Sequence, residues 1–385
     1  MNENKIDNKI LSILKKNFTN KIGLHEPFFI GGEVKNLKNC ILSNSVASKG
    51  KYLNLFKEKI KKFTKSKNVI LVNSGTSALH LSLIASGVKK NDEVLMPSLN
   101  YIASANTTLY CNAIPHFIEI TNKSLTIDPH MLSLYLKEIL RKKGNYYINS
   151  KTKRRVKALI CLHTFGHAAE VDKIKKICNK YKIFLIEDAA EALGSFYKKK
   201  HLGTFGKIGI LSFNGNKIVT TGGGGAILTN SKKLADLTSH LSKIGKKTHQ
   251  FKYSYDRLGY NYQMANLNSS IGSSQMENIN FFIKKKRILF KKYKKLFSKL
   301  SEIEVLEEPK YSKSNYWLQT ILLKKGNIRL RDKILNKLNI NGYGARPIWE
   351  PLHKINYLKK FPRSNLKITE DINKRIINLP SSSFL

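Results

Sequence analysis

The sequence has few acidic residues for its length. Among 385 residues there are 26 Asp and Glu against 69 Lys and Arg, so the formal net charge is +43. A surplus of this size could indicate a phosphate-rich partner such as nucleic acid, or an anionic membrane surface. Most of it, however, is Lys scattered in short runs among many Ile and Asn, a composition that an AT-rich genome also produces. The charge alone therefore assigns no partner.

Cysteines and long apolar stretches are scarce as well. Cys40, Cys111, Cys161 and Cys178 form no C-x-x-C pair and no cluster with His, so we expect neither a disulfide framework nor a metal site. No stretch reaches the ~18 apolar residues that would cross a bilayer, and the charged N-terminal segment lacks the apolar core of a signal peptide. These absences predict a soluble cytoplasmic protein without membrane insertion.

No internal repeat and no Pro-rich or Ser-rich linker divides the chain, so its organisation has to come from hydrophobic periodicity. Between residues 69 and 245, short apolar runs alternate with stretches of helical spacing. This alternation is typical of an α/β domain with a large, mostly parallel sheet. The predicted strands are 69–72, 93–96, 115–120, 158–162, 184–186, 208–213 and 226–228.

After about residue 245 the pattern changes to a Lys-rich amphipathic segment, followed by shorter strand-like and helix-like pieces. The sequence thus predicts an N-terminal helical segment (1–22), a large α/β domain (23–245) and a smaller C-terminal α+β domain (246–385). We expect the basic stretch 284–299 to be the solvated face of a helix rather than a binding surface.

A turn of small residues, 73–79, follows the first predicted strand and opens a helix. Backbone N–H groups at a helix N-terminus, helped by the hydroxyls of Ser74, Thr76 and Ser77, can bind a phosphate. A Ser or Thr cap without any ligand would have the same sequence, so the motif alone leaves both interpretations open.

Two carboxylates, Glu187 and Asp188, stand at the C-terminal end of another predicted strand, where open α/β sheets bind their ligands. Since side chains alternate along a strand, only one of the two can face a site. A buried carboxylate needs a cation or a strong donor, and a protonated ring nitrogen of a ligand would serve. Local sequence leaves open whether Asp188 instead caps a following helix.

The segment 210–225 places Lys217 between a strand and four consecutive glycines, Gly222 to Gly225. Glycines relax the backbone sterics of a tight loop and let another group approach closely. A partly desolvated Lys in such a loop is a competent nucleophile toward an aldehyde.

In this order, the phosphate-binding turn, the strand-end Asp and the glycine-flanked Lys resemble the pyridoxal-phosphate (PLP) sugar aminotransferases of the DegT/DnrJ/EryC1/StrS family. The resemblance covers nearly the whole chain and implies PLP-dependent fold type I. It is carried by His25-Glu26-Pro27, Ser74-Gly75-Thr76, Pro97-Ser98-Leu99-Asn100-Tyr101, His163-Thr164-Phe165-Gly166, Glu187-Asp188-Ala189-Ala190, Ser212-Phe213-Asn214, Lys217, Gly259-Tyr260-Asn261-Tyr262, Asn315-Tyr316-Trp317 and Arg346-Pro347-Ile348-Trp349.

The resemblance implies a role for each matching residue. Lys217 would hold PLP as a Schiff base and then act as base and acid of the proton shift, and Asp188 would keep the pyridine nitrogen protonated. Tyr101 would stack on the ring. Asn261 would reach the phosphate from a second subunit, so the implied active unit is a homodimer with shared sites. The full set of implied cofactor-binding residues is Gly75, Thr76, Ser77, Tyr101, His163, Asp188, Glu191, Ser212, Asn214, Lys217 and Asn261.

Other matching positions keep two interpretations. His163 and Glu191 could line the cofactor, Glu191 on the same helical face as Asp188, or could be packing and capping residues. Four residues could contact the sugar nucleotide or could form an aromatic cluster in the core of the small domain: Tyr316, Trp317, Arg346 and Trp349. Arg346 could pair with a diphosphate or with the carboxylate of glutamate.

Within the family, the glycine run resembles most the nonulosonic-acid branch, whose legionaminic-acid-type enzymes aminate a UDP-linked 4-keto-6-deoxy-N-acetylhexosamine. We therefore expect transfer of an amino group from L-glutamate to C4 of such a sugar. Gly223 replaces a Glu of most relatives, as it does in that branch, whereas Gln263 replaces a usual Arg. The alternatives are an aminotransferase acting at C3 or on a dTDP-linked or GDP-linked sugar, and, more remotely, a non-catalytic basic protein of the same fold that binds nucleic acid.

Overall fold

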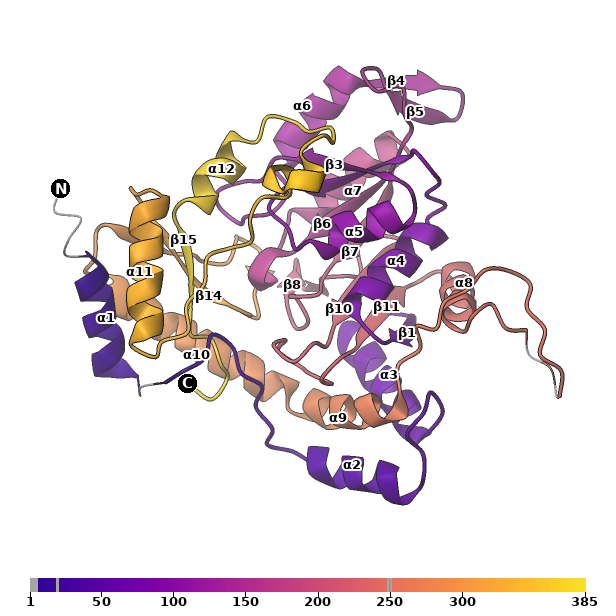
Figure 1. The fold of residues 1–385 in the computed structure, drawn as a ribbon, viewed down its shortest axis with the longest axis horizontal. Coiled ribbons are helices and arrows are strands. Elements are labelled where there is room, and N and C mark those ends of the chain that lie inside the picture. Colours follow the sequence, from indigo (N-terminus) through magenta and orange to yellow (C-terminus); the bar gives the residue numbers. More distant parts are fainter. Residues whose placement is uncertain (1–5, 19–20, 248, 250) are drawn as a thin grey trace.

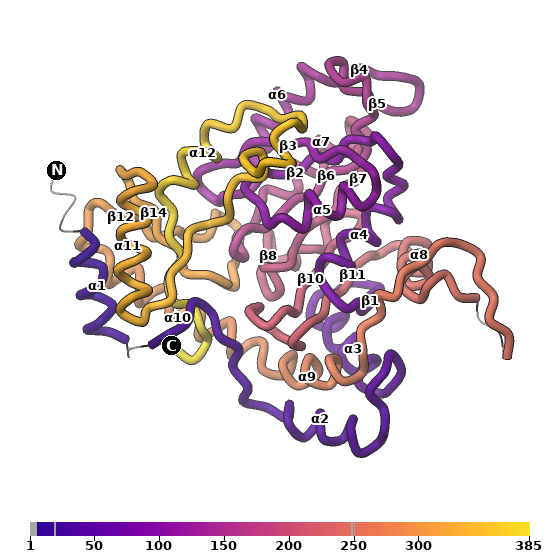
Figure 2. Tube along the Cα trace, in the orientation of Figure 1, coloured from indigo at the N-terminus to yellow at the C-terminus, as the bar shows by residue number. Residues whose placement is uncertain are grey.

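The computed structural model describes residues 6–18, 21–247, 249 and 251–385. It shows a large sheet covered by helices, and a smaller group of helices and strands beside it that contains α1, α10 and α11 (Figure 1). Figure 2 follows the same path as a tube, with α1 next to α11 and away from the large sheet. Residues 1–5, 19–20, 248 and 250 of the predicted N-terminal and C-terminal units lie outside the described residues.

Seven strands form the central sheet in the order β1-β11-β10-β7-β6-β2-β3. Only β11 runs against its two neighbours, whereas the pairs β10–β7, β7–β6, β6–β2 and β2–β3 are parallel. The mostly parallel α/β fold is thereby confirmed, and each predicted strand corresponds to one observed strand. Their bounds are β1 (Asn68–Val72), β2 (Glu93–Pro97), β3 (Ile114–Ile118), β6 (Val156–Leu162), β7 (Phe184–Asp188), β10 (Ile208–Ser212) and β11 (Gly225–Thr229).

Helices cover both faces of this sheet. Successive residues of a strand point to opposite faces, so each face contributes to a different apolar core. Leu159 and Cys161 of β6 belong to one apolar core, while Ala158 and Ile160 belong to the other. The first core is closed by α3 (Lys51–Thr64), α6 (Pro129–Ile139) and α7 (Val171–Lys180), and the second by α4 (Gly75–Ala85), α5 (Ala103–Tyr110) and α8 (Lys232–Ser242). Such a three-layer arrangement is the usual way to bury a parallel sheet.

The helix pair α2 (Glu33–Leu42) and α3 packs against α9 (Asn266–Glu277), which leads into α10 (Ile279–Phe297). The smaller part contains a three-stranded sheet in the order β12-β14-β15, and its core includes residues of α1, α10 and α11. The bounds are α1 (Ile6–Asn17), β12 (Ile303–Val305), β14 (Gln319–Leu323), α11 (Ile328–Ile340), α12 (Lys367–Asn373) and β15 (Ile376–Leu379). The domain limits given above stay a prediction.

Short elements complete the described chain. They are the hairpin β4 (Leu140–Lys143) with β5 (Tyr146–Asn149), the small sheet of β8 (Phe196–Tyr197), β9 (Lys200–His201) and β13 (Ser312–Lys313), and the 3-10 turns η1 (Thr164–Gly166), η2 (Leu352–Lys354) and η3 (Asn356–Leu358). Within the described residues, no helix is long and apolar enough to cross a membrane. The same residues contain no group of three or more His, Cys, Asp or Glu side chains placed to hold a metal ion.

One basic residue departs from the predicted solvated helix face of 284–299. Lys286 of α10 is fully buried, and its Nζ donates hydrogen bonds to the backbone carbonyls of Trp317 and Ser381. The prediction was wrong at this position because a Lys can enter a core where backbone carbonyls accept its N–H groups, and amphipathic spacing does not reveal such acceptors.

Candidate active site

The carboxyl ends of β7 and β10 open into a cavity of about 340 Å³. Because parallel strands end at the same edge of the sheet, the residues that follow them are brought together there. Most of the residues predicted for the site line this cavity: Gly75, Thr76, Tyr101, Asp188, Glu191, Ser212, Asn214, Lys217, Trp317 and Trp349. Asn216, Gly223, Gly224 and several apolar residues complete the wall.

The N-terminus of α4 forms one wall, as the turn of small residues predicts. Ser74 caps the helix, its Oγ accepting a hydrogen bond from the Ser77 backbone N–H at 3.0 Å. Gly75 is needed because a Cβ there would lie 2.9 Å from the Cβ of Ser212. Ser77 does not line the cavity, since its hydroxyl donates to Asn73 Oδ1 at 2.6 Å. The available phosphate donors are thus the helix N-terminus, Thr76 and Ser212.

Asp188 ends β7 with a carboxylate that faces the cavity and is only 4% exposed. Its Oδ1 accepts one backbone hydrogen bond, from Ala190 at 3.1 Å. Burial raises the pKa of this carboxyl, and the Ala190 N–H and the charge of Lys217 offset only part of the rise. The group is therefore short of a cationic partner, which a ligand bound in the cavity can provide.

Glu187, the preceding residue, points to the other side of the strand and is saturated with donors. It accepts hydrogen bonds from His163 Nε2 at 3.1 Å and from the backbone N–H groups of Gly203, Phe205 and Gly206. Burial alone would raise its pKa, but these donors outweigh burial and the pKa is lowered. Both ring nitrogens of His163 are hydrogen-bonded, Nε2 to this carboxylate and Nδ1 to the Ala169 N–H. The ring therefore points away from the cavity, which it does not line.

Lys217 lies in the loop that joins β10 to β11. Its Nζ is 3.3 Å from Glu191 Oε1 and 3.7 Å from the centre of the Trp317 ring, and its side chain is 13% exposed. The glycines after it permit this loop to fold back, because a Cβ on Gly225 would lie 2.5 Å from the backbone of Ser74. The loop thus presses against the N-terminus of α4 and places the amine in the same cavity as Asp188.

The Glu191 carboxylate contacts both Lys217 and the backbone of Phe165, which has a strained conformation. Its Oε2 accepts the N–H of Phe165 at 2.9 Å, while Phe165 has φ of +54°, a conformation that bulky residues rarely adopt. Burial raises the pKa of Glu191, against the effect of Lys217. No helix follows β7, so the prediction that Asp188 and Glu191 share a helical face was wrong; a turn brings both into the cavity.

Aromatic rings close the outer side of the cavity. Trp349 lies 6.5 Å from the Tyr101 ring and 5.5 Å from Phe165, which in turn lies 6.2 Å from Trp317. The indole N–H of Trp317 donates to the carbonyl of Asn216 at 2.7 Å, fixing the ring beside the Lys217 loop. Phe165 was not singled out from the sequence, although it stands between His163 and Gly166 in a motif that was.

Besides Ser77 and His163, three predicted residues lie outside this cavity. Tyr316 is 1% exposed and stacks on Phe290 with ring centres 4.1 Å apart, so of its two interpretations the structure supports the aromatic core. Arg346 is exposed and is not among the lining residues. Asn261 is exposed outside the cavity of its own chain, beside α8, where its backbone pairs with Lys243.

These residues fit PLP in four respects. A glycine-lined helix N-terminus suits its phosphate, a buried carboxylate without a cation suits its pyridinium, an amine in the same cavity suits its aldehyde, and Tyr101 offers a ring to stack on. The fold and the cavity together are those of a PLP-dependent enzyme of fold type I.

Comparison with known proteins gives the family. A model of the DegT/DnrJ/EryC1/StrS aminotransferase family matches residues 30–385, and the chain belongs to this family. The GDP-perosamine synthase of Escherichia coli O157:H7 is 36% identical over 363 residues, which cover 94% of this chain and 93% of that protein. The UDP-4-amino-4,6-dideoxy-N-acetyl-beta-L-altrosamine transaminase of Campylobacter jejuni subsp. jejuni serotype O:23/36 is 29% identical over 320 residues, covering 83% and 81%.

Solved structures agree in fold. PseC of Helicobacter pylori, an aminotransferase involved in the biosynthesis of pseudoaminic acid, superposes with a TM-score of 0.84 at 25% identity over 94% of this chain and 93% of that one. A proposed sugar aminotransferase of Streptococcus pneumoniae in its PLP form gives 0.85 at 20% identity over 95% and 94%. The protein is therefore a PLP-dependent nucleotide-sugar aminotransferase.

Proposed function

We propose that the protein transfers an amino group from L-glutamate to C4 of a UDP-linked 4-keto-6-deoxy-N-acetylhexosamine, for nonulosonic acid or surface glycan biosynthesis. The observation that carries the chemical part of this proposal is the convergence of Lys217, Asp188 and Glu191 on one cavity. PLP, when bound, supplies an electron sink for the carbon from which a proton is removed.

We assign the protein groups as follows. Lys217 would bind the cofactor covalently and, once displaced, would move the proton between the substrate carbon and the cofactor, because its Nζ is the amine in the cavity. Asp188 keeps the pyridine nitrogen charged, and Glu191 orients Lys217 from 3.3 Å. Tyr101, Trp317 and Trp349 limit the access of water and give the sugar apolar faces on which to lie.

The proposed shared site depends on the segment between α8 and α9. Figure 1 shows this segment extending far from the large sheet. Several large apolar side chains are exposed together on it: Phe251, Tyr253, Tyr255 and Leu258 are 74%, 77%, 55% and 79% exposed. A second subunit that covers these residues would also bring its Asn261 toward the phosphate of PLP. We therefore propose a homodimer, in the cytoplasm, with active sites completed across the interface.

The identity of the nucleotide is the finer part of the proposal. The activity for which the Campylobacter jejuni relative is named supports a UDP-linked 4-amino-4,6-dideoxy product, and the legionaminic-acid-like motif around Lys217 points the same way. The GDP-perosamine synthases, at 36% and 34% identity, favour a GDP-linked sugar as the second candidate. Both candidates use the same catalytic residues and differ only in the nucleotide and sugar they would bind.

Product analysis separates these candidates. The PLP-loaded enzyme and L-glutamate are incubated with UDP-linked 4-keto-6-deoxy-N-acetylglucosamine or with GDP-linked 4-keto-6-deoxymannose, and the products are identified by mass spectrometry and NMR. We expect amination at C4 of the UDP sugar with kcat/KM at least tenfold above that for the GDP sugar. The opposite preference would assign the GDP-linked substrate, and amination of neither sugar would overturn both.

The donor half-reaction is measured separately, by absorption spectroscopy without any sugar. L-Glutamate should convert the lysine-bound form of PLP into the pyridoxamine form in the wild type and leave Lys217→Ala unchanged. A wild type that fails this conversion while carrying PLP would remove L-glutamate as the donor, whatever sugar is used.

A further inference from the structure

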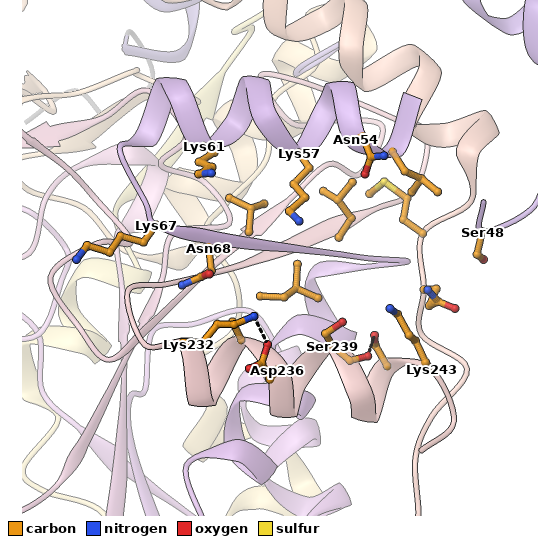
Figure 3. Close-up of a pocket in the computed structure, with 18 residues that line it drawn as sticks. Ser48, Asn54, Lys57, Lys61, Lys67, Asn68, Lys232, Asp236, Ser239 and Lys243 are labelled. Carbon is orange, nitrogen blue, oxygen red and sulfur yellow. Dashed lines mark hydrogen bonds and ion pairs between the residues drawn. The ribbon is translucent and has the colours of Figure 1, made fainter. Parts of the chain in front are cut away.

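A second, larger hollow lies on the outer side of β1. It has a volume of about 460 Å³ and is bounded by α3 on one side of the strand and by α8 on the other. Figure 3 shows the two helices with β1 between them and side chains of both directed into the space. We call this hollow the edge groove. It shares no lining residue with the catalytic cavity.

Five lysines line the edge groove, and Asp236 is its single acidic residue. Asp236 is already paired with Lys232 at 2.8 Å, and Lys61 lies 3.6 Å from Glu58. Within the described part of the chain, the three others, Lys57, Lys67 and Lys243, form no ion pair with a carboxylate. The groove therefore carries a net positive charge that an anionic ligand would neutralise.

The lysines approach from different elements. Lys57 and Lys61 descend from α3 and Lys243 points in from the end of α8, whereas Lys67 points away at the far end (Figure 3). Lys57 and Lys61 are half-buried. Lysines at a sheet edge can serve only to discourage pairing with other strands, and β1 is such an edge. That role needs charges in solvent, which fits the exposed Lys67 and Lys243, whereas the half-buried Lys57 and Lys61 lie over the hollow.

The floor of the groove is apolar. Leu53, Ile70, Leu71 and Met264 line it, and the amide of Asn54 and the hydroxyl of Ser239 lie among the lysines. The volume is within the common range of small-molecule sites, about 300–1,000 Å³, and polar side chains outnumber these apolar ones in the lining. An inorganic anion would use only the cations, whereas a nucleoside phosphate would use both kinds of surface.

The edge groove also touches both ends of the segment that carries Asn261. Lys243 precedes this segment and Gln263 follows it, and both line the groove. Lys243 pairs with Asn261 and Gln263 with Val72 through isolated backbone bridges. A ligand held between α3 and these two residues would fix the base of the segment.

We propose that the edge groove binds a nucleoside diphosphate, with its phosphates on Lys57, Lys61 and Lys243 and its base on the apolar floor. Occupancy restrains the segment 243–263 and so links nucleotide level to the position of Asn261. The binding part of this inference stands without the proposed sugar substrate, because it concerns residues outside the catalytic cavity. Only the link to Asn261 rests on the proposed function.

The test is calorimetric titration of the PLP-loaded enzyme with ADP and with inorganic pyrophosphate. The variant Lys57→Gln/Lys243→Gln is compared with Lys142→Gln/Lys143→Gln, which removes the same charge from the exposed strand β4. We expect one saturable ADP site in the wild type and in the β4 variant, at least tenfold weaker binding in the groove variant, and at least tenfold weaker binding of pyrophosphate than of ADP. The PLP absorption band should be the same in all three proteins.

A second variant tests shape independently of charge. Ser239→Trp fills the groove from α8 and should abolish the ADP site, and hydrogen exchange in 243–263 should slow on adding ADP to the wild type but not to this variant. Equal ADP affinity in the two double variants, or adsorption without saturation, would overturn the proposal and leave the lysines as guards of the strand edge. Equal affinity for ADP and pyrophosphate would overturn its nucleoside part.

Discussion

Glu187 and Asp188 are neighbours on one strand, are both buried, and have opposite environments. On the side of the strand away from the cavity, Glu187 accepts hydrogen bonds from the His163 imidazole and from three backbone N–H groups, and its pKa is lowered. Facing the cavity, Asp188 accepts one backbone N–H and a side-chain hydrogen bond from Ser104, and burial still raises its pKa. Burial alone therefore does not identify a functional carboxylate. The difference lies in whether the protein itself provides the partners or leaves room for a ligand to do so.

A comparison of Lys286 with Lys217 shows the same contrast. Lys286 is enclosed and donates to two carbonyls, whereas Lys217 has one carboxylate at 3.3 Å and faces a cavity. We expect Lys217→Ala to lose covalent PLP and to reduce turnover at least about 10³-fold, because one amine performs both attachment and proton transfer. Lys286→Met, the matched control, should keep the absorption band of lysine-bound PLP. If Lys217→Ala still bound PLP covalently, Lys217 would not be the attachment site and would not differ from Lys286 in function.

The second largest effect should be a difference in catalysis between variants of Asp188 and of Glu187. Asp188→Asn keeps the size of the side chain and removes the charge that holds the pyridinium, so kcat/KM should fall about 10²- to 10³-fold, the usual effect of losing a preorganised electrostatic partner. Glu187→Gln should change it less than about tenfold. Steady-state kinetics at saturating PLP provide the measurement, and similar losses in both variants would show that the two sides of the strand are not distinct in function.

For stability we expect the opposite order, with the larger loss in the Glu187 variant and not in the Asp188 variant. Glu187→Gln leaves His163 and three backbone N–H groups without their carboxylate, and we expect the free energy of unfolding to fall by about 3 kcal/mol, as for other broken buried pairs. Asp188→Asn in the cofactor-free protein should be neutral or stabilising, because it removes a poorly compensated buried charge. Denaturant unfolding of the cofactor-free proteins measures both, and a larger loss in Asp188→Asn would contradict the comparison.

The smallest effects should appear in the pH dependence. The folded pKa of Asp188 lies above its ordinary value of 3.8, so the folded state binds more protons there and stability falls as the pH rises through that window. The folded pKa of Glu187 lies below its ordinary value of 4.5, so its contribution is present above that value and is lost as the pH falls. Melting temperatures of the cofactor-free proteins should show Asp188→Asn gaining on the wild type with rising pH, and Glu187→Gln approaching it with falling pH.

Much of the fold could be predicted from periodicity, because a parallel sheet buried on both faces has strands that are nearly continuous apolar runs. The site residues could be predicted where the backbone decides their position, as for Gly75, Asp188 and Lys217. The sequence could not decide side-chain direction where it depends on partners distant along the chain. It left two interpretations open for His163, which turns to Glu187, and for Tyr316, which stacks on Phe290. The prediction was wrong for Lys286, which enters the core because two backbone carbonyls accept its N–H groups.

The reversed strand β11 has a consequence for how the catalytic centre is assembled. Since β10 and β11 are adjacent, antiparallel and joined by residues 213–224, Lys217 belongs to a local unit that can form without distant contacts. Asp188 reaches the same cavity through parallel pairing, which requires long crossovers and is intrinsically slow. We expect the amine to be in place before its acid, so that during refolding the appearance of the cofactor spectrum reports completion of the slow parallel half of the sheet.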